Sequence, residues 1–276
     1  MKNQWDAIAR RDGVSEQDCR RLPGSFAYEG FRVPLQEATR PGGDKGCLIS
    51  LPAAIKGHYY RRPAQGSEMQ APRSRSRSRR AATDFDADFF ARYYGDPATR
   101  VADAGDAERV AGLIGGIVHY LELPVRRILD AGCGVGLLRK PLGAHFPRAA
   151  YDGLELSPYL CRRYGWRQGS LADIAVEQPY DLVVCHDVLQ YLDDRSAARA
   201  LANLARITRG ALYFSVLTGG DWRHAADQSR TDRAVCLRPA DWYRGRLRRG
   251  FRHIASGLHV ARALRPILWE LERPWT

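Results

Sequence analysis

Patterns that would assign a protein to a specialised class are largely missing from these 276 residues. The six cysteines form no C-x-x-C pair and no spacing typical of metal ligands, so we expect buried, reduced thiols with neither disulfides nor zinc. The most apolar runs, near 110–121 and 211–220, are shorter than the roughly 18 to 20 residues that span a membrane. The first residues do not begin a secretory signal, and the sequence contains no internal repeat. We therefore expect a soluble cytoplasmic protein that binds no metal and enters no membrane.

The net charge is strongly basic, but it is unevenly distributed along the chain. A formal charge of +12 is typical of a nucleic-acid-binding protein. Residues 1–82 hold 16 Lys and Arg against 8 Asp and Glu, a net of +8, whereas the other 194 residues hold 27 against 23, a net of +4. Most of the excess therefore lies in the first 82 residues, and the remainder gives nucleic-acid binding little support.

Residues 1–82 differ in composition from the rest of the chain. They lack sustained periodicity and are rich in Pro, Gly and Arg, with an Arg-Ser run between Pro72 and Arg80. Such a segment cannot bury enough apolar surface to offset its ordering entropy, so we expect a low-complexity, disordered extension. The Arg-Ser run is typical of a nucleic-acid or membrane-surface tail, and also of a solvated linker without a partner, which we favour. Translation starting at Met69 is a further hypothesis.

From residue 103 onward helical and strand patterns alternate, which is typical of a doubly wound α/β sheet. At its centre, a strand expected at 126–130 leads into Gly132, Gly134 and Gly136, and a helix is expected over 137–146. Glycines let the backbone turn sharply and approach a ligand closely, and the helix directs its N-terminal amides toward that ligand. This pattern predicts a nucleotide-like ligand at the carboxyl edge of a parallel sheet.

The spacing of the glycines narrows the choice of ligand. A dinucleotide motif is G-x-G-x-x-G, but here Leu137 stands where the third glycine belongs. The carboxylate of Asp130 would repel a pyrophosphate and would suit an ammonium group or ribose hydroxyls. S-adenosylmethionine carries both of these groups and no phosphate. The run Ile128 to Gly136 resembles the first motif of the class I S-adenosylmethionine-dependent methyltransferases, of the bacterial small-molecule type.

This resemblance implies an α/β fold over residues 83–276: a Rossmann-like, seven-stranded sheet that is mostly parallel with an antiparallel last strand. Glu155, at the end of the next strand, can accept hydrogen bonds from both ribose hydroxyls, as in dehydrogenases also. Ser170 stands where the family has an aspartate near the adenine, and Leu171 follows it. The resemblance therefore implies a cofactor site made of Asp130, Gly132, Gly134, Gly136, Glu155, Ser170, Leu171 and His186.

The stretch 180–192 matches the family's fourth strand and the loop after it, where cofactor and acceptor meet. His186 and Tyr191 are the candidate catalytic residues, although a histidine at a strand end is more often structural. Tyr93 and Tyr94, in a helical aromatic stretch, are candidates either for a lid or for simple packing. The connection 218–237 is expected to contact the acceptor, with Arg223, Arg230 or Arg233 holding an anionic group or lying on the surface.

We therefore expect methyl transfer from S-adenosylmethionine to an O, N, C or S nucleophile of a small molecule, with nucleic acid disfavoured as acceptor. Two alternatives remain. One is a non-catalytic protein with a degenerate nucleoside pocket, which the departure at Ser170 favours. The other is an NAD(P)-dependent oxidoreductase, which Leu137 and Asp130 disfavour. The sequence does not indicate the acceptor or the oligomeric state.

Overall fold

The computed structural model describes residues 80–273. Nearly all of the expected N-terminal extension, and the hypothesis of a start at Met69, lie outside the described residues. Within the described part, no helix is both long and apolar enough to cross a membrane.

A seven-stranded sheet forms the centre of the described residues, with the order β3-β2-β1-β4-β5-β7-β6. The first five strands are mutually parallel, and β7 runs antiparallel to both of its neighbours. This arrangement confirms the expected fold class. The strands are β1 (Arg127–Ala131), β2 (Ala150–Glu155), β3 (Arg167–Gln168), β4 (Tyr180–His186), β5 (Thr208–Ser215), β6 (Phe251–Ala255) and β7 (Leu258–Ala261).

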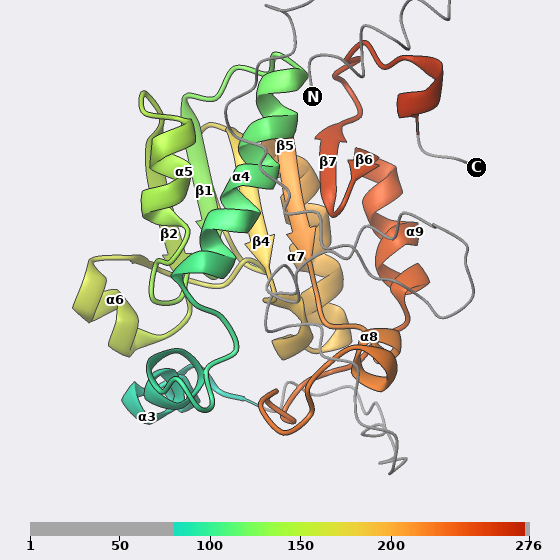
Figure 1. The fold of residues 1–276 in the computed structure, drawn as a ribbon. Helices are drawn as coiled ribbons and strands as arrows, with labels where there is room; N and C mark the ends of the chain where they lie inside the picture. Colours follow the sequence, from blue (N-terminus) through green and yellow to red (C-terminus); the bar gives the residue numbers. More distant parts are fainter. Residues whose placement is uncertain (1–79, 274–276) are drawn as a thin grey trace, which may run out of the picture. The chain divides into compact units, whose positions relative to one another are not determined.

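Helices cover both faces of this sheet, as Figure 1 shows. Helices α4 and α5 pack on one face, and α7 and α9 on the other. The short elements η3, α3 and η4, together with α8, lie near the carboxyl ends of the parallel strands. The helical elements are η3 (Ala82–Asp84), α3 (Ala87–Phe90), η4 (Ala91–Gly95), α4 (Ala104–Tyr120), α5 (Arg139–His145), α6 (Pro158–Tyr164), η5 (Leu189–Tyr191), α7 (Asp194–Ile207), α8 (Gly219–His224), α9 (Ala240–Gly250) and η6 (Glu270–Glu272).

Strands β1, β4 and β5 divide their side chains between two cores, because successive residues of a strand point to opposite faces. Ile128 and Val184 pack against α4 and α5, whereas Leu129 and Val183 pack against α7. All four are at most 1% exposed. Both faces of the central strands are therefore buried, which explains their continuous apolar sequence.

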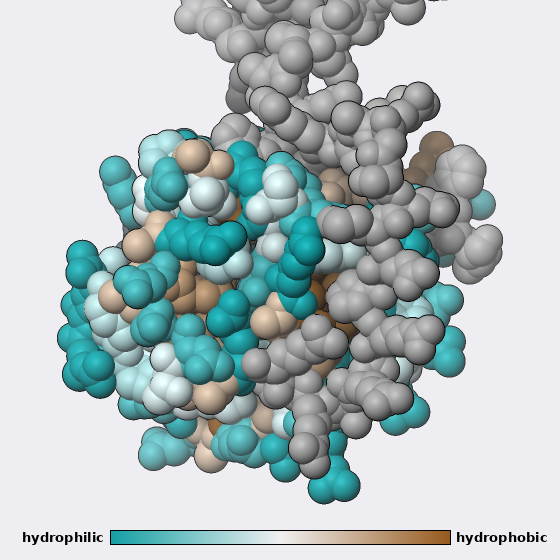
Figure 2. Space-filling model, turned by 90° about the horizontal axis from the view of Figure 1, so that it is seen from below, coloured by the Kyte–Doolittle hydropathy of each residue, from teal (hydrophilic) through white to brown (hydrophobic). Residues whose placement is uncertain are grey.

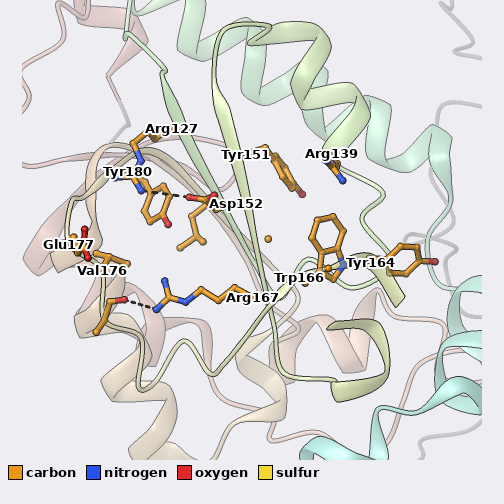
Figure 3. Close-up of a pocket in the computed structure, with 14 residues that line it drawn as sticks. Arg127, Arg139, Tyr151, Asp152, Tyr164, Trp166, Arg167, Val176, Glu177 and Tyr180 are labelled. Atoms are coloured by element: carbon orange, nitrogen blue, oxygen red, sulfur yellow. Dashed lines mark hydrogen bonds and ion pairs between the residues drawn. The ribbon is translucent and has the colours of Figure 1, made fainter. Parts of the chain in front are cut away.

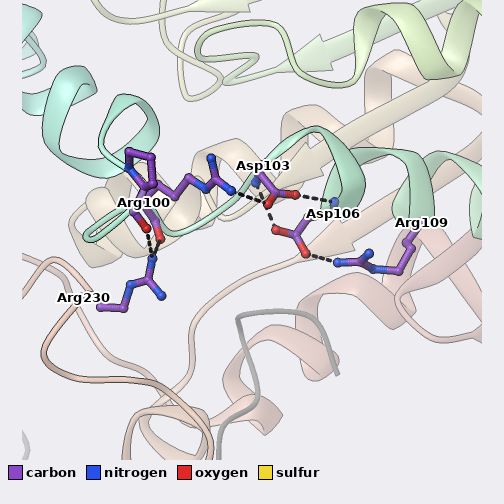
Figure 4. Close-up of polar contacts among 6 residues, drawn as sticks. Arg100, Asp103, Asp106, Arg109 and Arg230 are labelled. Atoms are coloured by element: carbon purple, nitrogen blue, oxygen red, sulfur yellow. Dashed lines mark hydrogen bonds and ion pairs between the residues drawn. The ribbon is translucent and has the colours of Figure 1, made fainter. Parts of the chain in front are cut away.

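Two helix starts follow from local sequence. Ser157 caps α6, its hydroxyl accepting a hydrogen bond from the Leu160 amide at 3.2 Å, with Pro158 in the first turn. Asp103 and Asp106 form a reciprocal capping box at the start of α4, which Figure 4 shows.

The third strand is only two residues long. Gly165, at a φ of 73°, ends α6 in the left-handed conformation, so the chain becomes extended only afterwards. Strand β3 then pairs with β2 only at Leu154 and Glu155. Residues 150–152 of β2 therefore have no partner strand on the side of β3 within residues 80–273.

Candidate functional site

The glycine turn after β1 has one crowded side and one open side. Gly132 and Gly134 have φ of 79° and 53°, a region that favours glycine. A Cβ on Gly132 would lie 2.4 Å from the Val188 side chain, whereas a Cβ on Gly134 would meet nothing within 4 Å. Gly132 therefore allows close packing, and Gly134 leaves space that a ligand can use.

Glu155 holds this turn in place from the end of β2. Its carboxylate accepts hydrogen bonds from the backbone amides of Gly134 at 2.8 Å, Leu156 at 2.7 Å and Ser157 at 2.9 Å. The side chain is 7% exposed. Because each carboxylate oxygen has two lone pairs, the oxygen bonded to Gly134 can accept one further hydrogen bond from a ligand.

One cavity at the carboxyl ends of the strands unites most of the residues predicted from the sequence. The lid candidate Tyr94 lines it, as do seven of the predicted cofactor and catalytic residues: Gly132, Gly134, Glu155, Ser170, Leu171, His186 and Tyr191. Its other walls come from residues before α4, from the ends of β2 and β3 and from the loop after β4, namely Arg80, Phe85, Phe89, Phe90, Leu154, Leu156, Gly169, Asp187, Val188 and Leu192. Figure 2 views the molecule from this end, where hydrophobic residues show in hollows between hydrophilic ones.

Asp130 and Gly136 do not line this cavity. Asp130 is 2% exposed and accepts a hydrogen bond from the Tyr151 hydroxyl at 2.5 Å. Burial raises the pKa of Asp130 to about 6, against the opposing effects of the Tyr151 hydrogen bond and of His186. Gly136 is required by close packing instead, because its Cβ would lie 2.8 Å from the Trp166 ring.

Ser170 and Leu171 form the part of the wall where the family has its adenine contacts. The Ser170 hydroxyl accepts a hydrogen bond from the Ala172 amide at 3.1 Å, so it stabilises its own turn. Leu171 is 4% exposed and belongs to the core beneath the cavity. Asp173, the acidic residue of this turn, is exposed, and its Oδ1 atom lies 3.1 Å from the Arg199 Nη2 atom.

The end of β4 brings two ionisable groups to the cavity. The His186 Nε2 atom lies 3.5 Å from the Asp187 Oδ2 atom, and each side chain is 24% exposed. Asp187 also accepts a hydrogen bond from the Ser215 hydroxyl at 3.0 Å. Its φ of 56° is left-handed, a conformation that costs a residue other than glycine about 1–3 kcal/mol. Such strain is common at functional sites, and no local sequence pattern indicated it at this position.

An aromatic cluster forms part of the lining of the cavity. Tyr191 packs edge-on against Phe85, with ring centroids 5.3 Å apart, and Phe89 lies against both rings. Burial raises the pKa of Tyr191 well above its ordinary value, so its phenol stays protonated. Burial raises the pKa of Tyr94 as well.

Two arginine contacts join the segment before α4 to the connection after β5. Arg80 donates two hydrogen bonds, at 2.6 and 2.9 Å, to Asp232, whose side chain is 6% exposed. Arg230 donates to the carbonyl oxygen of Arg100 at 2.5 Å, a contact that Figure 4 shows. We call these two contacts the arginine clamp. Each of the two contacts joins residues more than 100 positions apart in the sequence, and no local pattern indicated either one.

The candidate acceptor arginines lie outside the cavity. Arg230 serves the clamp, and Arg223 and Arg233 are exposed. Tyr93 does not line the cavity either, although it packs against Phe89 with ring centroids 4.8 Å apart. No group of three or more His, Cys, Asp or Glu residues within 80–273 is arranged to hold a metal ion.

Comparison with known proteins identifies the central part of this fold. A family model described as a methyltransferase domain matches residues 129–210. The ubiquinone biosynthesis O-methyltransferase of Xanthomonas euvesicatoria is 33% identical over 111 residues, which are 35% of this chain and 45% of that protein. The malonyl-[acyl-carrier protein] O-methyltransferase of Legionella pneumophila is 29% identical over 132 residues, 41% of this chain and 46% of that protein. The chain thus spans about half the length of the curated relatives it matches.

Among solved structures, the sugar N-methyltransferase KedS8 from Streptoalloteichus is 21% identical, with a TM-score of 0.46. The comparison covers 72% of this chain and 97% of that chain. The sheet order, the glycine turn and the methyltransferase domain matched over residues 129–210 together support a class I S-adenosylmethionine-dependent methyltransferase.

Proposed function

We propose that this protein transfers a methyl group from S-adenosylmethionine to a small-molecule acceptor held in the cavity above the carboxyl ends of the strands. One observation carries this proposal. The open face of Gly134, the carboxylate of Glu155 and the polar end of β4 line a single cavity. A ligand with a nucleoside at one end and a reactive group at the other fits this distribution of groups.

The residues of the cavity suit the adenosyl part of the cofactor. Glu155 would accept a ribose hydroxyl on the oxygen that Gly134 shares, and Leu156 and Leu171 offer apolar contacts to the adenine. The Ser170 hydroxyl, already bonded to the Ala172 amide, could also donate to the ring. Asp130 would act indirectly, by fixing Tyr151 beneath the glycine turn.

The bound cofactor would supply an electrophilic methyl group on a sulfonium. The chain's own contribution is to align the acceptor in that direction, and such alignment can lower a barrier by several kcal/mol. His186 would take the proton of a hydroxyl or ammonium nucleophile, and Asp187, 3.5 Å away, would stabilise the resulting imidazolium. Tyr191, with its raised pKa, would position the acceptor rather than remove its proton.

The enclosure of the site favours a small acceptor over a nucleic acid. Phe85, Phe89 and Tyr191 form a continuous aromatic wall, and the arginine clamp ties the segment that carries the two phenylalanines to the connection after β5. An acceptor has to fit in the cavity that this wall encloses. The small size of the acceptor and the cytoplasmic location of the protein stay predictions.

Glu155→Gln tests the cofactor assignment. Loss of a charged ribose contact should weaken S-adenosylmethionine binding by about 1–3 kcal/mol, measured by calorimetry on the full chain. Glu108→Gln, an exposed change on α4, is the matched control and should leave affinity unchanged. Because Glu155 also holds three backbone amides, the melting temperature is measured in parallel. A lower melting temperature with unchanged affinity would show that Glu155 only supports the turn.

His186→Asn tests the proposed proton acceptor. We expect kcat against a panel of hydroxyl and amine acceptors to fall by about 10² or more. Tyr191→Phe keeps the ring packing and should reduce kcat less, because its hydroxyl is not proposed to move a proton. Equal losses in both variants would contradict this division of roles.

The same assays separate the alternatives. Cofactor binding without turnover on any acceptor, in the wild-type chain, would favour the non-catalytic protein. Tight binding of NADH, seen as a change in its fluorescence, would favour the oxidoreductase. Absence of S-adenosylmethionine binding at millimolar concentration would overturn the proposed function.

A further inference from the structure

The outer edge of β2 is unpaired over the first half of its length within residues 80–273. Strand β1 pairs with β2 from Ala150 to Leu154, but β3 pairs only at Leu154 and Glu155. In a parallel ladder the pairing of Leu154 with Arg167 places the Gly153 carbonyl against β3, so within residues 80–273 only 150–152 of β2 have a neighbouring strand on one side alone. An open edge of this kind presents backbone donors and acceptors to any extended chain that comes alongside.

The backbone groups that face this edge can be assigned. In a parallel ladder both polar groups of a residue point to the same neighbour, and successive residues alternate between the two neighbours. The amide of Ala150 donates to the Arg126 carbonyl at 2.8 Å, on the β1 side. Tyr151 consequently points its backbone groups away from β1, toward the open edge, and the Gly153 amide faces the same edge.

A cavity of about 630 Å³ surrounds this edge. Figure 3 shows its lining in two groups, on either side of the β2 ribbon. Tyr151, Trp166 and Arg139 lie in one group, and Asp152, Tyr180 and Arg167 lie in the other. A hollow that wraps around the edge of a strand matches the shape of an additional strand, whose side chains alternate between the two faces.

The lining carries three arginines, Arg127, Arg139 and Arg167, against two carboxylates, Asp152 and Glu177, and this net charge of +1 favours an acidic occupant. Arg139 stacks over Trp166 at 5.5 Å and forms no ion pair with an acidic side chain of residues 80–273. Arg167 donates only to the carbonyl oxygen of Ala175, at 2.7 Å. The Arg127 Nη2 atom lies 3.6 Å from the Asp152 Oδ2 atom, and the Arg127 guanidinium lies over the Tyr180 ring. Guanidinium groups on both faces of the edge suit carboxylates on neighbouring residues of an added strand.

We infer that the edge of β2 is a docking site for an extended acidic peptide of a partner protein, which adds a parallel or antiparallel strand outside Tyr151–Gly153. Two neighbouring acidic residues of the peptide would point to opposite faces, one to Arg139 and the other to Arg127 and Arg167. The chain's own Arg-Ser run is unsuitable, because it carries the same charge as the cavity. This surface is separate from the proposed catalytic cavity, and the inference does not depend on methyl transfer.

Titration of the ¹⁵N-labelled full chain with blocked pentapeptides tests the inference. The panel carries Asp or Glu at two adjacent central positions, with Thr or Val elsewhere. We expect saturable shifts and slower hydrogen exchange at the Tyr151 and Gly153 amides. The same peptides N-methylated at alternate residues keep their charge but cannot pair with a strand, so they should not protect these amides.

Arginine variants provide the second measurement. Arg139→Ala and Arg167→Ala should each weaken peptide binding about tenfold, whereas Arg148→Ala, exposed and outside the cavity, should not. Three results would overturn the inference. They are absence of saturable shifts across the whole panel, equal binding of the N-methylated peptides, and shifts confined to residues away from β2.

Discussion

At the scale of single residues, Asp130 and His259 are buried ionisable groups whose pKa values move in opposite directions. Burial raises the pKa of Asp130 to about 6 and lowers the pKa of His259, on β7, to about 4. The native state therefore holds a proton on Asp130 more tightly than the unfolded chain does. It holds a proton on His259 less tightly.

The signs of the two effects on stability follow from proton binding. The stabilisation that the raised pKa of Asp130 gives to the native state is complete below about pH 4 and is lost as the pH rises through about 6. The stabilisation that the lowered pKa of His259 gives is complete above about pH 6.5 and is lost as the pH falls toward about 4. Each of these changes in pKa corresponds to roughly 3 kcal/mol in the free energy of unfolding, so the two effects largely cancel between about pH 4 and 6.

Single substitutions should expose each effect. Asp130→Asn lacks the stabilisation that wild type loses as the pH rises from about 4 to 6, so its free energy of unfolding relative to wild type should increase over this interval by on the order of 2–3 kcal/mol. His259→Gln should give a difference of opposite slope. Urea unfolding at a series of pH values measures both, and the subtraction from wild type removes the contribution of the other carboxylates. Parallel curves for wild type and both variants would contradict these assignments.

At the scale of elements, the arginine clamp fixes the aromatic wall of the cavity. The segment from η3 to η4 has few contacts with the sheet. Its polar attachments are Arg80 before it, the Arg100 carbonyl after it, and the Phe85 carbonyl, which accepts a hydrogen bond from the Ser157 hydroxyl, while Phe85 and Phe90 pack in an aromatic cluster. A segment attached at a few points opens with a lower free energy than the core. We therefore expect release of the clamp to open the cavity to an acceptor.

Asp232→Asn should loosen this segment without unfolding the domain. The Arg80 ion pair is only partly buried, so the loss should be about 1–3 kcal/mol and should be local. We expect faster hydrogen exchange at residues 82–95 and an unchanged melting temperature of the sheet. Asp241→Asn removes the exposed pair with Arg244 and is the matched control. Uniformly faster exchange throughout the domain would show that Asp232 supports the fold rather than the wall.

At the scale of the whole molecule, charge distinguishes a small-molecule enzyme from a nucleic-acid enzyme. Residues 83–276 carry a net of only +4, while residues 1–82 carry +8. A chain shortened to begin at Met69 should keep its melting temperature and its cofactor affinity, and it should bind generic RNA and DNA weakly. Electrophoretic mobility at rising salt measures this binding. Tight binding that declines steeply with salt would contradict the proposed small acceptor.

Local sequence determined the centre of the site. The strand, the glycine turn and the cap of α6 each depend on residues within a few positions of one another, and their φ values and capping bonds follow from residue type. The alternation of helices and strands determined the doubly wound sheet, because strands buried on both faces need helices on both sides. Glu155 was located by its distance along the chain from the glycines.

Tertiary structure decided which side chains turn toward the cavity. Asp130 turns to Tyr151 instead, because a buried carboxylate needs a hydrogen-bond donor and the next strand supplies one. The contact of Arg80 with Asp232 joins positions 152 residues apart, and the strained Asp187 is held by Ser215 on β5. Such contacts depend on how separate elements pack in space. Sequence spacing contains no record of that packing, whereas it does record the turns and caps that each element makes within itself.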